Sequence, residues 1–253
     1  MDTVDVSIVL ACYNASSYAE ESIRQIQAVM DATIYRYELI FVDDKSKDDT
    51  VAIVQKCIEG KDNCHLHLHD INIGRGKTVF DGFTKAQGTI VGFIDLDLDN
   101  PARYIPSMIL GIRSGNADVC TALRVYQWKL NLYFLVRLIC SKGYAFLSSR
   151  LLGTNLKDTE TGCKFFRKEK IMPSMQESKS SGWFWDTEIM TRAYYADLKI
   201  LEIPTLFIRN THVSTVNLLP ETLRYLKSLM KFLPVVKKLR PAWLHRREKS
   251  VIY

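Results

Sequence analysis

Short apolar runs alternate with amphipathic segments along the first 95 residues of the chain. Near-continuous apolar runs predict buried strands at 6–11, 37–42 and 89–94, and a short alternating run predicts another at 65–69. Apolar residues at helical spacing predict helices at 18–30, at about 50–57 and at 74–87. This alternation predicts an α/β fold whose parallel sheet is covered by helices on both faces.

Polar clusters follow three of the predicted strands. They are Tyr13 with Asn14, Asp43 with Asp44, and the alternating aspartates at 95, 97 and 99. In open parallel sheets, ligands bind outside the carboxyl ends of the strands. We therefore expect these clusters to converge in space and to form a binding site.

Asp95, Asp97 and Asp99 stand two residues apart after a buried strand. In extended backbone this spacing places all three carboxylates on one face, where they repel one another unless a cation neutralises them. Mg²⁺ or Mn²⁺, held by one or two carboxylates together with water and substrate phosphates, suits this pattern. An equally good interpretation is a solvated acidic loop that ends a strand.

Two further features have alternative interpretations. Asp44 could accept hydrogen bonds from a base or a ribose, or Asp43 and Asp44 could cap the helix that follows Asp48. Residues 74–77, Gly-Arg-Gly-Lys, open a helix whose amides could hold a phosphate, although a plain turn is the simpler interpretation. These residues form neither a dinucleotide-binding fingerprint nor a P-loop.

After residue 120 the alternation ends. An aromatic-rich helical stretch is expected at 126–152, a segment with glycine and acids at 158–166, a helix at 183–195 and a strand at 200–208. Residues 126–152 and 223–240 combine apolar spacing with many basic residues, which suits an anionic membrane surface. Core-facing helices that pack a dimer are the alternative. Pro234 is expected to end or kink the second of these helices.

Composition limits the classes of ligand and the cellular compartment that we expect for this protein. The chain has 253 residues with a formal charge of +6, which favours anionic ligands without choosing among them. Six dispersed cysteines without a C-x-x-C pair predict a reduced, cytosolic protein, and the first residues do not resemble a secretory signal. The longest apolar stretch, 130–140, is shorter than the roughly 20 residues of a membrane span.

Six motifs occur in the order typical of one enzyme family. They are VSIVLACYN (6–14), ELIFVDDKSKDDT (38–50), NIGRGK (72–77), FIDLDLDNP (93–101), DTETGCKFFRKE (158–169) and WFWDTE (183–188). Together they resemble family 2 of the glycosyltransferases, most closely its dolichol- and polyprenol-phosphate mannosyl- and glucosyltransferases. The resemblance implies a Rossmann-like A-type glycosyltransferase fold over 1–215, with a nucleotide-sugar half (about 1–122), an acceptor half (about 123–215) and a basic amphipathic tail (216–253).

The resemblance also implies roles for individual residues. Those expected to bind the nucleotide sugar are Ala11, Tyr13, Val42, Asp44, Asp95, Leu96, Asp97, Arg124 and Arg209. Asp97 and Asp99 would coordinate Mg²⁺ or Mn²⁺ at the diphosphate, Arg124 would lie near the sugar and the acceptor phosphate, and Arg209 near the donor diphosphate.

The acceptor decides what further chemistry is needed. A single in-line displacement would invert the anomeric centre. A phosphate acceptor is already largely ionised and needs positioning by cations, for which Arg124, Lys164 and Arg209 are candidates. A hydroxyl acceptor needs a carboxylate that takes its proton, and the candidates are Asp158, Asp186 and Glu188.

These inferences lead to a metal-dependent, inverting glycosyltransferase that acts on a polyprenyl or dolichyl phosphate at the cytoplasmic face of a membrane. The alternatives are an enzyme that glycosylates a glycan or protein hydroxyl, and a non-catalytic scaffold that binds nucleotide sugars; a homodimer is possible in each case. No nucleic-acid partner is expected, because the basic residues gather in helices and the tail while the ligand edge of the sheet is acidic.

Overall fold

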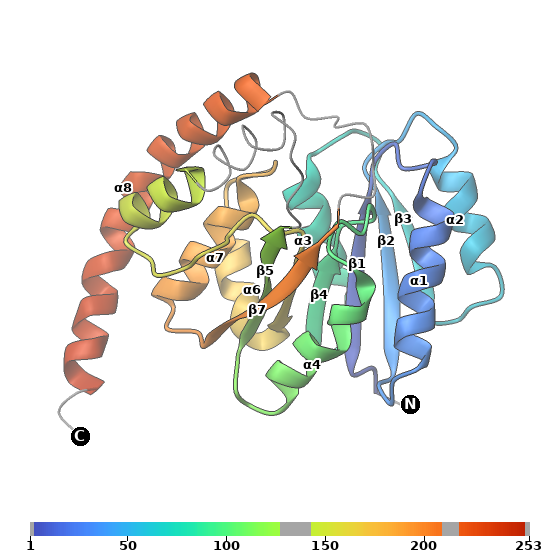
Figure 1. Cartoon of the computed structure of the whole chain (residues 1–253), viewed down its shortest axis with the longest axis horizontal. Helices are drawn as coiled ribbons and strands as arrows, with labels where there is room; N and C mark the ends of the chain where they lie inside the picture. The colour runs from blue at the N-terminus through green and yellow to red at the C-terminus, as the bar shows by residue number, and fades with distance from the viewer. Residues whose placement is uncertain (1–2, 127–142, 209–217, 251–253) are drawn as a thin grey trace.

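A central twisted sheet organises the chain. The computed structural model describes residues 3–126, 143–208 and 218–250 (Figure 1), with side chains up to residue 244 except those of 218–222. Seven described strands lie in the order β3-β2-β1-β4-β6-β5-β7, and β6 is antiparallel to its neighbours. The strands are β1 (Val6–Cys12), β2 (Tyr37–Asp43), β3 (Cys64–Leu68), β4 (Ile90–Ile94), β5 (Val119–Tyr126), β6 (Cys163–Arg167) and β7 (Ile200–Phe207).

Helices cover both faces of this sheet. One face packs against α1 (Ala19–Asp31), α2 (Thr50–Ile58), η1 (Ala102–Tyr104) and α4 (Ile105–Arg113), and the other against α3 (Arg75–Lys85), α6 (Lys168–Gln176) and α7 (Trp185–Tyr195). Because side chains alternate along a strand, Ile8 and Leu10 join the first core cluster and Val9 joins the second. The predicted α/β architecture with a mostly parallel sheet is confirmed.

The predicted elements match the observed ones to within about two residues at most ends. Helices α4 and α6 and strands β5 and β6 had no predicted range, and β6 overlaps the segment 158–166, which was described only by its glycine and acids. Lys164 in the middle of β6 breaks the apolar pattern, yet it is fully buried. Gly92 of β4 faces Phe165 of β6, and a Cβ at Gly92 would lie 2.2 Å from the Phe165 ring.

A long helix, α8 (Leu218–Ser250), runs along the left of Figure 1 and packs against α7. Leu229, Phe232 and Val236 are buried on one side, so this helix is amphipathic as expected. A second segment, 143–152, is also helical and contributes Tyr144 to the same apolar cluster. The helix continues through Pro234, so Pro234 does not end it, and a kink there stays a prediction.

The remaining expectations on composition can be compared with the described residues. Four cysteines, at 12, 64, 120 and 163, are buried with free thiols, and Cys57 is half-buried and also free. Cys140 lies outside the described residues. Within the described part of the chain, no helix has both the length and the apolar character needed to cross a bilayer.

Candidate active site

The loops that follow the parallel strands meet at one edge of the sheet, as the sequence predicted. The backbone N–H of Asn14 donates to Ser46 Oγ at 3.0 Å, which ties the loop after β1 to the loop after β2. Beyond β4, the N–H of Asp95 donates to the carbonyl of Gly162 at 2.7 Å. The N–H of Ile208, just after β7, donates to the carbonyl of Asp99 at 2.9 Å.

The three alternating aspartates lie on a turn, so the expectation of extended backbone at 95–99 was wrong. The N–H of Leu98 donates to the carbonyl of Asp95 at 3.1 Å, and Leu98 has a positive φ of 51°. Leu96 and Leu98 are buried and anchor this turn in the core. The three carboxylates therefore do not share one face of a strand.

Asp95 belongs to a charged network that we call the Arg75 cluster (Arg75, Asp95, Lys164 and Asp186), in which Lys164 and Asp186 are buried. Arg75 Nε and Nη2 donate to Asp95 Oδ1 at 2.8 and 2.6 Å, and Nη1 donates to Asp186 Oδ2 at 2.5 Å. Lys164 Nζ donates to Asp186 Oδ1 at 2.7 Å. Two cations thus balance two carboxylates where α3, the turn after β4, β6 and α7 meet.

Burial shapes the proton affinities in the Arg75 cluster. It raises the pKa of Asp95 to about 6, against the lowering effect of Arg75, and the nearby charge of Asp97 adds to the rise. Burial also lowers the pKa of Lys164, although Asp186 opposes this. The guanidinium of Arg75 lies over the ring of Trp183, 4.8 Å from its centroid.

Gly162 explains how the Asp-Thr-Glu-Thr-Gly segment (158–162) reaches the Arg75 cluster. A Cβ at Gly162 would lie 1.8 Å from Asp95 Oδ2, so no larger residue fits against that carboxylate. The other end of the segment, at Asp158, lies beside the end of β5. One five-residue segment thus connects two charged groups of the site.

The second group is the Arg124 cluster (Arg124, Asp158 and Glu160). Arg124 Nε and Nη2 donate to the two carboxylate oxygens of Asp158 at 2.7 and 2.8 Å, and Glu160 Oε2 lies 3.9 Å from Nη2. Burial tends to raise the pKa of Asp158, but Arg124 lowers it below its ordinary value. Burial raises the pKa of Glu160 to about 7 in spite of Arg124.

Glu160 was missed by the sequence analysis, which considered Asp158 alone in this segment. Its position two residues after Asp158 in the same motif was the available signal. The structure surrounds it with groups from distant parts of the chain. Tyr144 and Tyr225 stack edge to face at 5.2 Å, and the charge of Glu160 adds to the effect of burial in raising the pKa of both.

Asp44 is buried and holds a neighbouring loop. Its carboxylate accepts hydrogen bonds from the N–H groups of Ile73 at 2.8 Å and Gly74 at 2.9 Å, and it lies 3.0 Å from His69 Nδ1. The alternative that Asp43 and Asp44 cap α2 was wrong, because Asp48 accepts from the Thr50 N–H instead. Binding of a base or ribose by Asp44 stays a prediction.

Several amides at the start of α3 already have hydrogen-bond partners. The N–H groups of Gly76 and Lys77 both donate to the carbonyl of Ser181, at 2.8 and 3.3 Å. A Cβ at Gly76 would lie 2.3 Å from Trp185 Cβ, so glycine there allows α3 and α7 to approach closely. These contacts give residues 74–77 a packing role, and phosphate binding there stays a prediction.

Glu188 and Asp186 lie two residues apart on α7 and have different partners. Glu188 accepts hydrogen bonds from the N–H and Oγ of Ser180 at 3.1 and 2.6 Å and from Arg192 Nε at 2.9 Å. These bonds fix the segment before α7, so the structure does not bring Glu188 into either cluster. Asp186 is buried between Arg75 and Lys164, which makes it a positioning group rather than an accessible base.

The remaining predicted nucleotide contacts differ in exposure. The side chains of Val42 and Leu96 are buried in the two core clusters, so only their backbone atoms can meet a ligand. Ala11 is half-buried, whereas Tyr13 is exposed and has a ring that can stack on a base. Arg209 lies outside the described residues.

Asp97 and Asp99 are the carboxylates expected to hold a divalent cation, and this role stays a prediction. Both are half-buried on the turn after β4, and burial with the charge of Asp97 raises the pKa of the neighbouring Tyr18 to about 12. Within the described residues, no three His, Cys, Asp or Glu side chains form a metal-binding group. Mg²⁺ and Mn²⁺ sites with one or two carboxylates suit this limited donor set.

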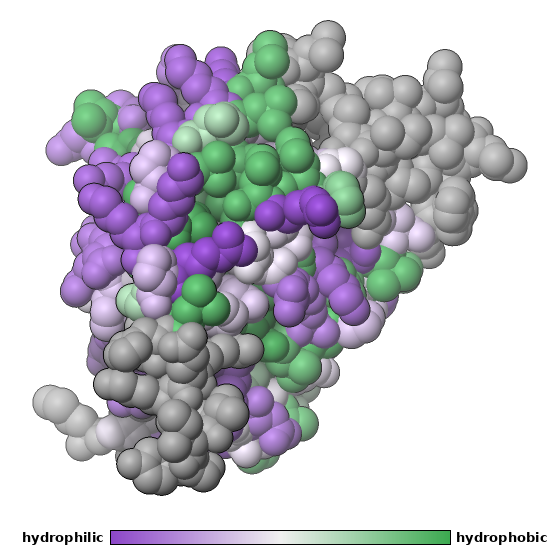
Figure 2. All heavy atoms as spheres, turned by 90° about the vertical axis from the view of Figure 1, so that its left-hand side faces the viewer, coloured by the Kyte–Doolittle hydropathy of each residue, from purple (hydrophilic) through white to green (hydrophobic). Residues whose placement is uncertain are grey.

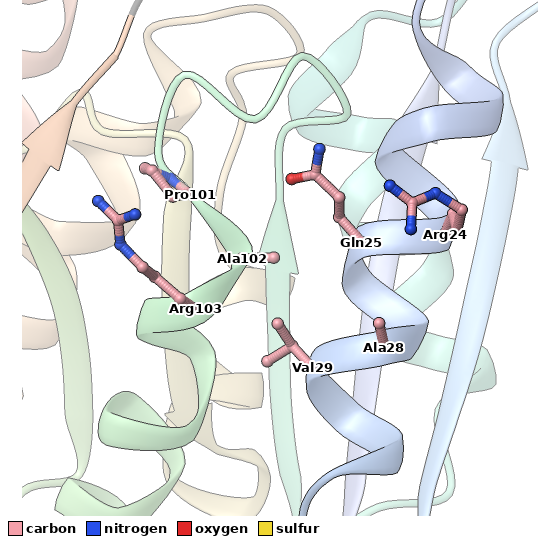
Figure 3. A pocket seen from close by; sticks show the side chains of 7 residues that line it. All are labelled: Arg24, Gln25, Ala28, Val29, Pro101, Ala102 and Arg103. Atoms are coloured by element: carbon pink, nitrogen blue, oxygen red, sulfur yellow. The ribbon is translucent and has the colours of Figure 1, made fainter.

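A hollow of about 270 Å³ between α1 and η1 lies apart from these groups (Figure 3). Arg24 and Arg103 line it, but none of the predicted site residues does. Arg24 pairs with Glu21 at 2.6 Å, and the guanidinium of Arg103 lies over the ring of Tyr104. We therefore place the candidate site at the sheet edge and not in this hollow.

Comparison with known proteins identifies sequence relatives. The model of glycosyl transferase family 2 matches residues 7–172. Glycosyltransferase AglD of Haloferax volcanii is 27% identical over 203 residues, 79% of this chain and 32% of that protein. An undecaprenyl-phosphate 4-deoxy-4-formamido-L-arabinose transferase of Pseudomonas syringae pv. syringae is 33% identical over 105 residues, 41% of this chain and 31% of that protein. The chain thus spans about a third of the length of these relatives.

Solved structures share the fold. Glucosyl-3-phosphoglycerate synthase of Mycobacterium tuberculosis, in complex with Mn²⁺, UDP and glucosyl-3-phosphoglycerate, has a TM-score of 0.66 and 16% identity, covering 92% of this chain and 78% of that chain. Its complex with UDP alone has a TM-score of 0.70 and 17% identity, covering 91% and 80%. At this identity the likeness establishes the fold, and the expected A-type glycosyltransferase fold is confirmed.

Proposed function

The chain belongs to glycosyl transferase family 2, and from that premise we propose that it transfers a sugar from a nucleoside-diphosphate sugar to a polyprenyl or dolichyl phosphate. The reaction inverts the anomeric centre and uses Mg²⁺ or Mn²⁺. The name of the Pseudomonas relative, an undecaprenyl-phosphate sugar transferase, supports a lipid phosphate as acceptor. The UDP and Mn²⁺ in the structural neighbour support the donor class and the metal.

The observation that carries this proposal is the arrangement of segment 158–162. Asp158 pairs with Arg124 at one end, and Gly162 touches Asp95 beside the metal-binding candidates Asp97 and Asp99 at the other. A donor diphosphate at the turn after β4 and an acceptor at Arg124 would therefore be separated by one short segment. Such proximity is what a direct displacement between bound substrates requires.

Separate residues would bind the metal, the nucleotide base and the acceptor. Asp97 and Asp99 would hold the divalent cation, which when bound offsets the negative charge of the diphosphate leaving group. Tyr13 would stack on the nucleotide base, and the half-buried Ala11 would border it. Arg124, oriented by the fork of Asp158, would place the acceptor oxygen in line with the anomeric carbon.

A phosphate acceptor agrees with the state of the buried carboxylates. Asp158 is held by Arg124, and Asp186 is held by both Arg75 and Lys164. Carboxylates paired with cations are weak proton acceptors. A phosphate monoester is largely ionised near neutral pH and needs no base to become a nucleophile.

Membrane attachment belongs to the same proposal. The face with α8 carries apolar surface next to strongly polar surface (Figure 2). Its exposed apolar side chains include Phe146, Leu151, Leu223, Met230 and Leu244. Helices with this composition and neighbouring lysines lie at the surface of anionic bilayers. We place the protein peripherally at the cytoplasmic face of a membrane, where a lipid phosphate is accessible.

A thermal-shift screen tests the donor half of the proposal. The purified protein is heated with UDP, GDP and their common sugar conjugates, each with and without Mn²⁺. A ligand that binds the native state raises the melting temperature by mass action. We expect a metal-dependent rise with one nucleotide class, and no rise with any nucleotide would contradict the proposal.

Glu160 favours one second candidate, a glycosyltransferase that acts on a hydroxyl. Its pKa of about 7 suits a general base at neutral pH, and its side chain is 18% exposed. For a hydroxyl acceptor, Glu160→Gln should lower kcat by roughly 10²-fold to 10⁴-fold. For a phosphate acceptor, the same variant should keep most of its turnover.

A further inference from the structure

A groove of about 770 Å³ lies between α8 and the segment that leads into α7. One wall is formed by residues 179–184 together with Glu188 and Arg192, and the other by α8 from Arg224 to Val235. We call it the α7–α8 groove. Neither the nucleotide contacts nor the metal candidates lie in it, so the donor side of the reaction does not account for it.

The α7–α8 groove carries an excess of positive charge. Lys179, Lys227 and Lys231 line it with exposed side chains. No carboxylate among the described residues pairs with any of these three ammonium groups, whereas Arg192 in the same groove is neutralised by Glu177 at 2.8 Å and Glu188 at 2.9 Å. Because Lys227 and Lys231 are four residues apart on one helix, they present their charges on the same side. An anionic ligand is the complement of such a surface.

The inner surface of the groove is aromatic. Phe184 and Phe232 pack edge to face at 5.9 Å, and both are nearly buried. Trp183 is 44% exposed and supplies a large accessible ring on the same wall. Cationic and aromatic groups together complement a ligand with a phosphate at one end and an apolar chain beyond it.

Two groove residues also contact the site already described. The ring of Trp183 stacks on Arg75, so the groove reaches the Arg75 cluster. Tyr225 lines the groove and is close enough to Glu160 and Asp186 for their charges to add to the effect of burial in raising its pKa. Two lining residues of the groove thus connect it with the described site, Trp183 by contact with Arg75 and Tyr225 by its proximity to Glu160 and Asp186.

We infer that the α7–α8 groove is a capture site for the acceptor, an isoprenyl monophosphate, whose phosphate is held by Lys179, Lys227 and Lys231 before it moves past Trp183 and Tyr225 to Arg124. This inference rests on the proposed function and adds a second phosphate-binding position to it. The lysines contribute to capture and not to the displacement. Their loss should therefore raise the KM for the lipid and leave kcat at saturating lipid unchanged.

The kinetic test compares two double variants of α8. Lys227→Gln with Lys231→Gln removes two groove charges, and Lys237→Gln with Lys238→Gln removes two exposed charges on the same helix outside the groove lining. The groove pair should raise the KM for the lipid phosphate at least tenfold, with kcat and the donor KM within twofold. The control pair should leave all three constants within twofold. Equal effects of the two pairs, or no effect of the groove pair, would overturn the inference.

A binding test needs no turnover. Farnesyl phosphate is titrated into the protein without nucleotide while tryptophan fluorescence is followed, with Trp183→Phe to assign the signal and with farnesol and inorganic phosphate as partial ligands. Saturable binding that weakens at least tenfold in the groove pair and not in the control pair supports the capture site. Lysine-dependent binding of phosphatidylserine vesicles with none of farnesyl phosphate would contradict it.

The two hypotheses can fail separately. If farnesyl phosphate binds through Lys227 and Lys231 but no sugar transfer to lipid phosphates occurs, the capture site stands and the proposed function fails. If transfer occurs and neither binding nor the acceptor KM depends on these lysines, the proposed function stands and the capture site fails.

Discussion

Arg75 and Arg124 each hold an aspartate, yet their surroundings differ in charge. The Arg75 cluster pairs two cations with two carboxylates, and its Lys164 is fully buried. The Arg124 cluster has one cation beside two carboxylates, and Glu160 in it has a pKa of about 7. The first cluster is electrically balanced, with Asp95 at a pKa of about 6, whereas the second has one carboxylate more than it has cations.

This difference indicates a division of labour. A balanced buried network fixes the elements that it joins, here α3, the turn after β4, β6 and α7, and changing it should mainly affect stability. A cluster with one carboxylate in excess responds to substrate and to pH, and changing it should mainly affect turnover. Four variants test this division, ordered from the largest expected effect to the smallest.

Asp97→Asn should lower turnover about 10³-fold with little change in the free energy of unfolding, because Asp97 is half-buried and is a proposed ligand of the metal. Asp95→Asn, two residues away, should also destabilise the protein, because Arg75 loses one of its two carboxylate partners. Initial rates with Mn²⁺ and urea unfolding separate the two effects. A near-normal rate for Asp97→Asn would refute the metal assignment.

Lys164→Met should lower the free energy of unfolding by about 3 kcal/mol, because it leaves the Arg75 cluster with uncompensated negative charge. Lys170→Met is the matched control, since Lys170 pairs with Asp118 at 2.8 Å but is 46% exposed. A surface pair of this kind contributes about 0–1 kcal/mol. Equal losses in urea unfolding would mean that the burial of Lys164 has no special role.

Arg124→Lys should lower kcat/KM for the acceptor about 30-fold, equivalent to about 2 kcal/mol, because lysine cannot form the two parallel hydrogen bonds to Asp158. The donor KM should stay unchanged. Steady-state kinetics with each substrate varied in turn measure both constants. A rise in the donor KM alone would contradict the prediction, because it would mean that Arg124 binds the donor and not the acceptor.

Glu160→Gln should change how stability depends on pH. Because the folded pKa of Glu160, about 7, lies above its ordinary value of 4.5, the folded state favours the protonated form. That stabilisation is complete below about pH 4.5 and is lost as the pH rises through 7. Between pH 6 and pH 8, the free energy of unfolding measured with urea should fall by about 1 kcal/mol more for the unmodified protein than for the glutamine variant. An equal fall in the free energy of unfolding of both proteins would show that Glu160 has an ordinary pKa.

The sequence predicted those elements whose burial needs no partner from elsewhere. Strands β1, β2 and β4 consist almost wholly of apolar residues, so their position in the core follows from their own composition. Strand β6 was missed because it contains Lys164. The charge of this buried lysine is compensated by Asp186, which lies 22 residues away in the sequence. Local pattern cannot show a compensation of this kind.

The site was predicted in part for the same reason. The clustering of polar residues at the sheet edge follows from strand direction and was correct. The turn at 95–99 was not foreseen, because alternation of Asp and Leu is equally compatible with extended backbone, and the positive φ of Leu98 leaves no mark in composition. The hydrogen bond between Arg75 and Asp186 joins residues 111 positions apart in the sequence, and the spacing of residues within a motif cannot predict such a contact.

Transfer of radiolabelled sugar is the most direct test of the central claim. The purified protein is incubated with Mn²⁺, the nucleotide sugar that stabilises it, and either a polyprenyl phosphate or the matching polyprenol without phosphate. We predict that label enters the organic extract with the polyprenyl phosphate and not with the polyprenol. This label should be lost when metal is omitted and in the Asp97→Asn variant. Label in the polyprenol, or none in either lipid while a glycan or protein hydroxyl is labelled, would contradict the account.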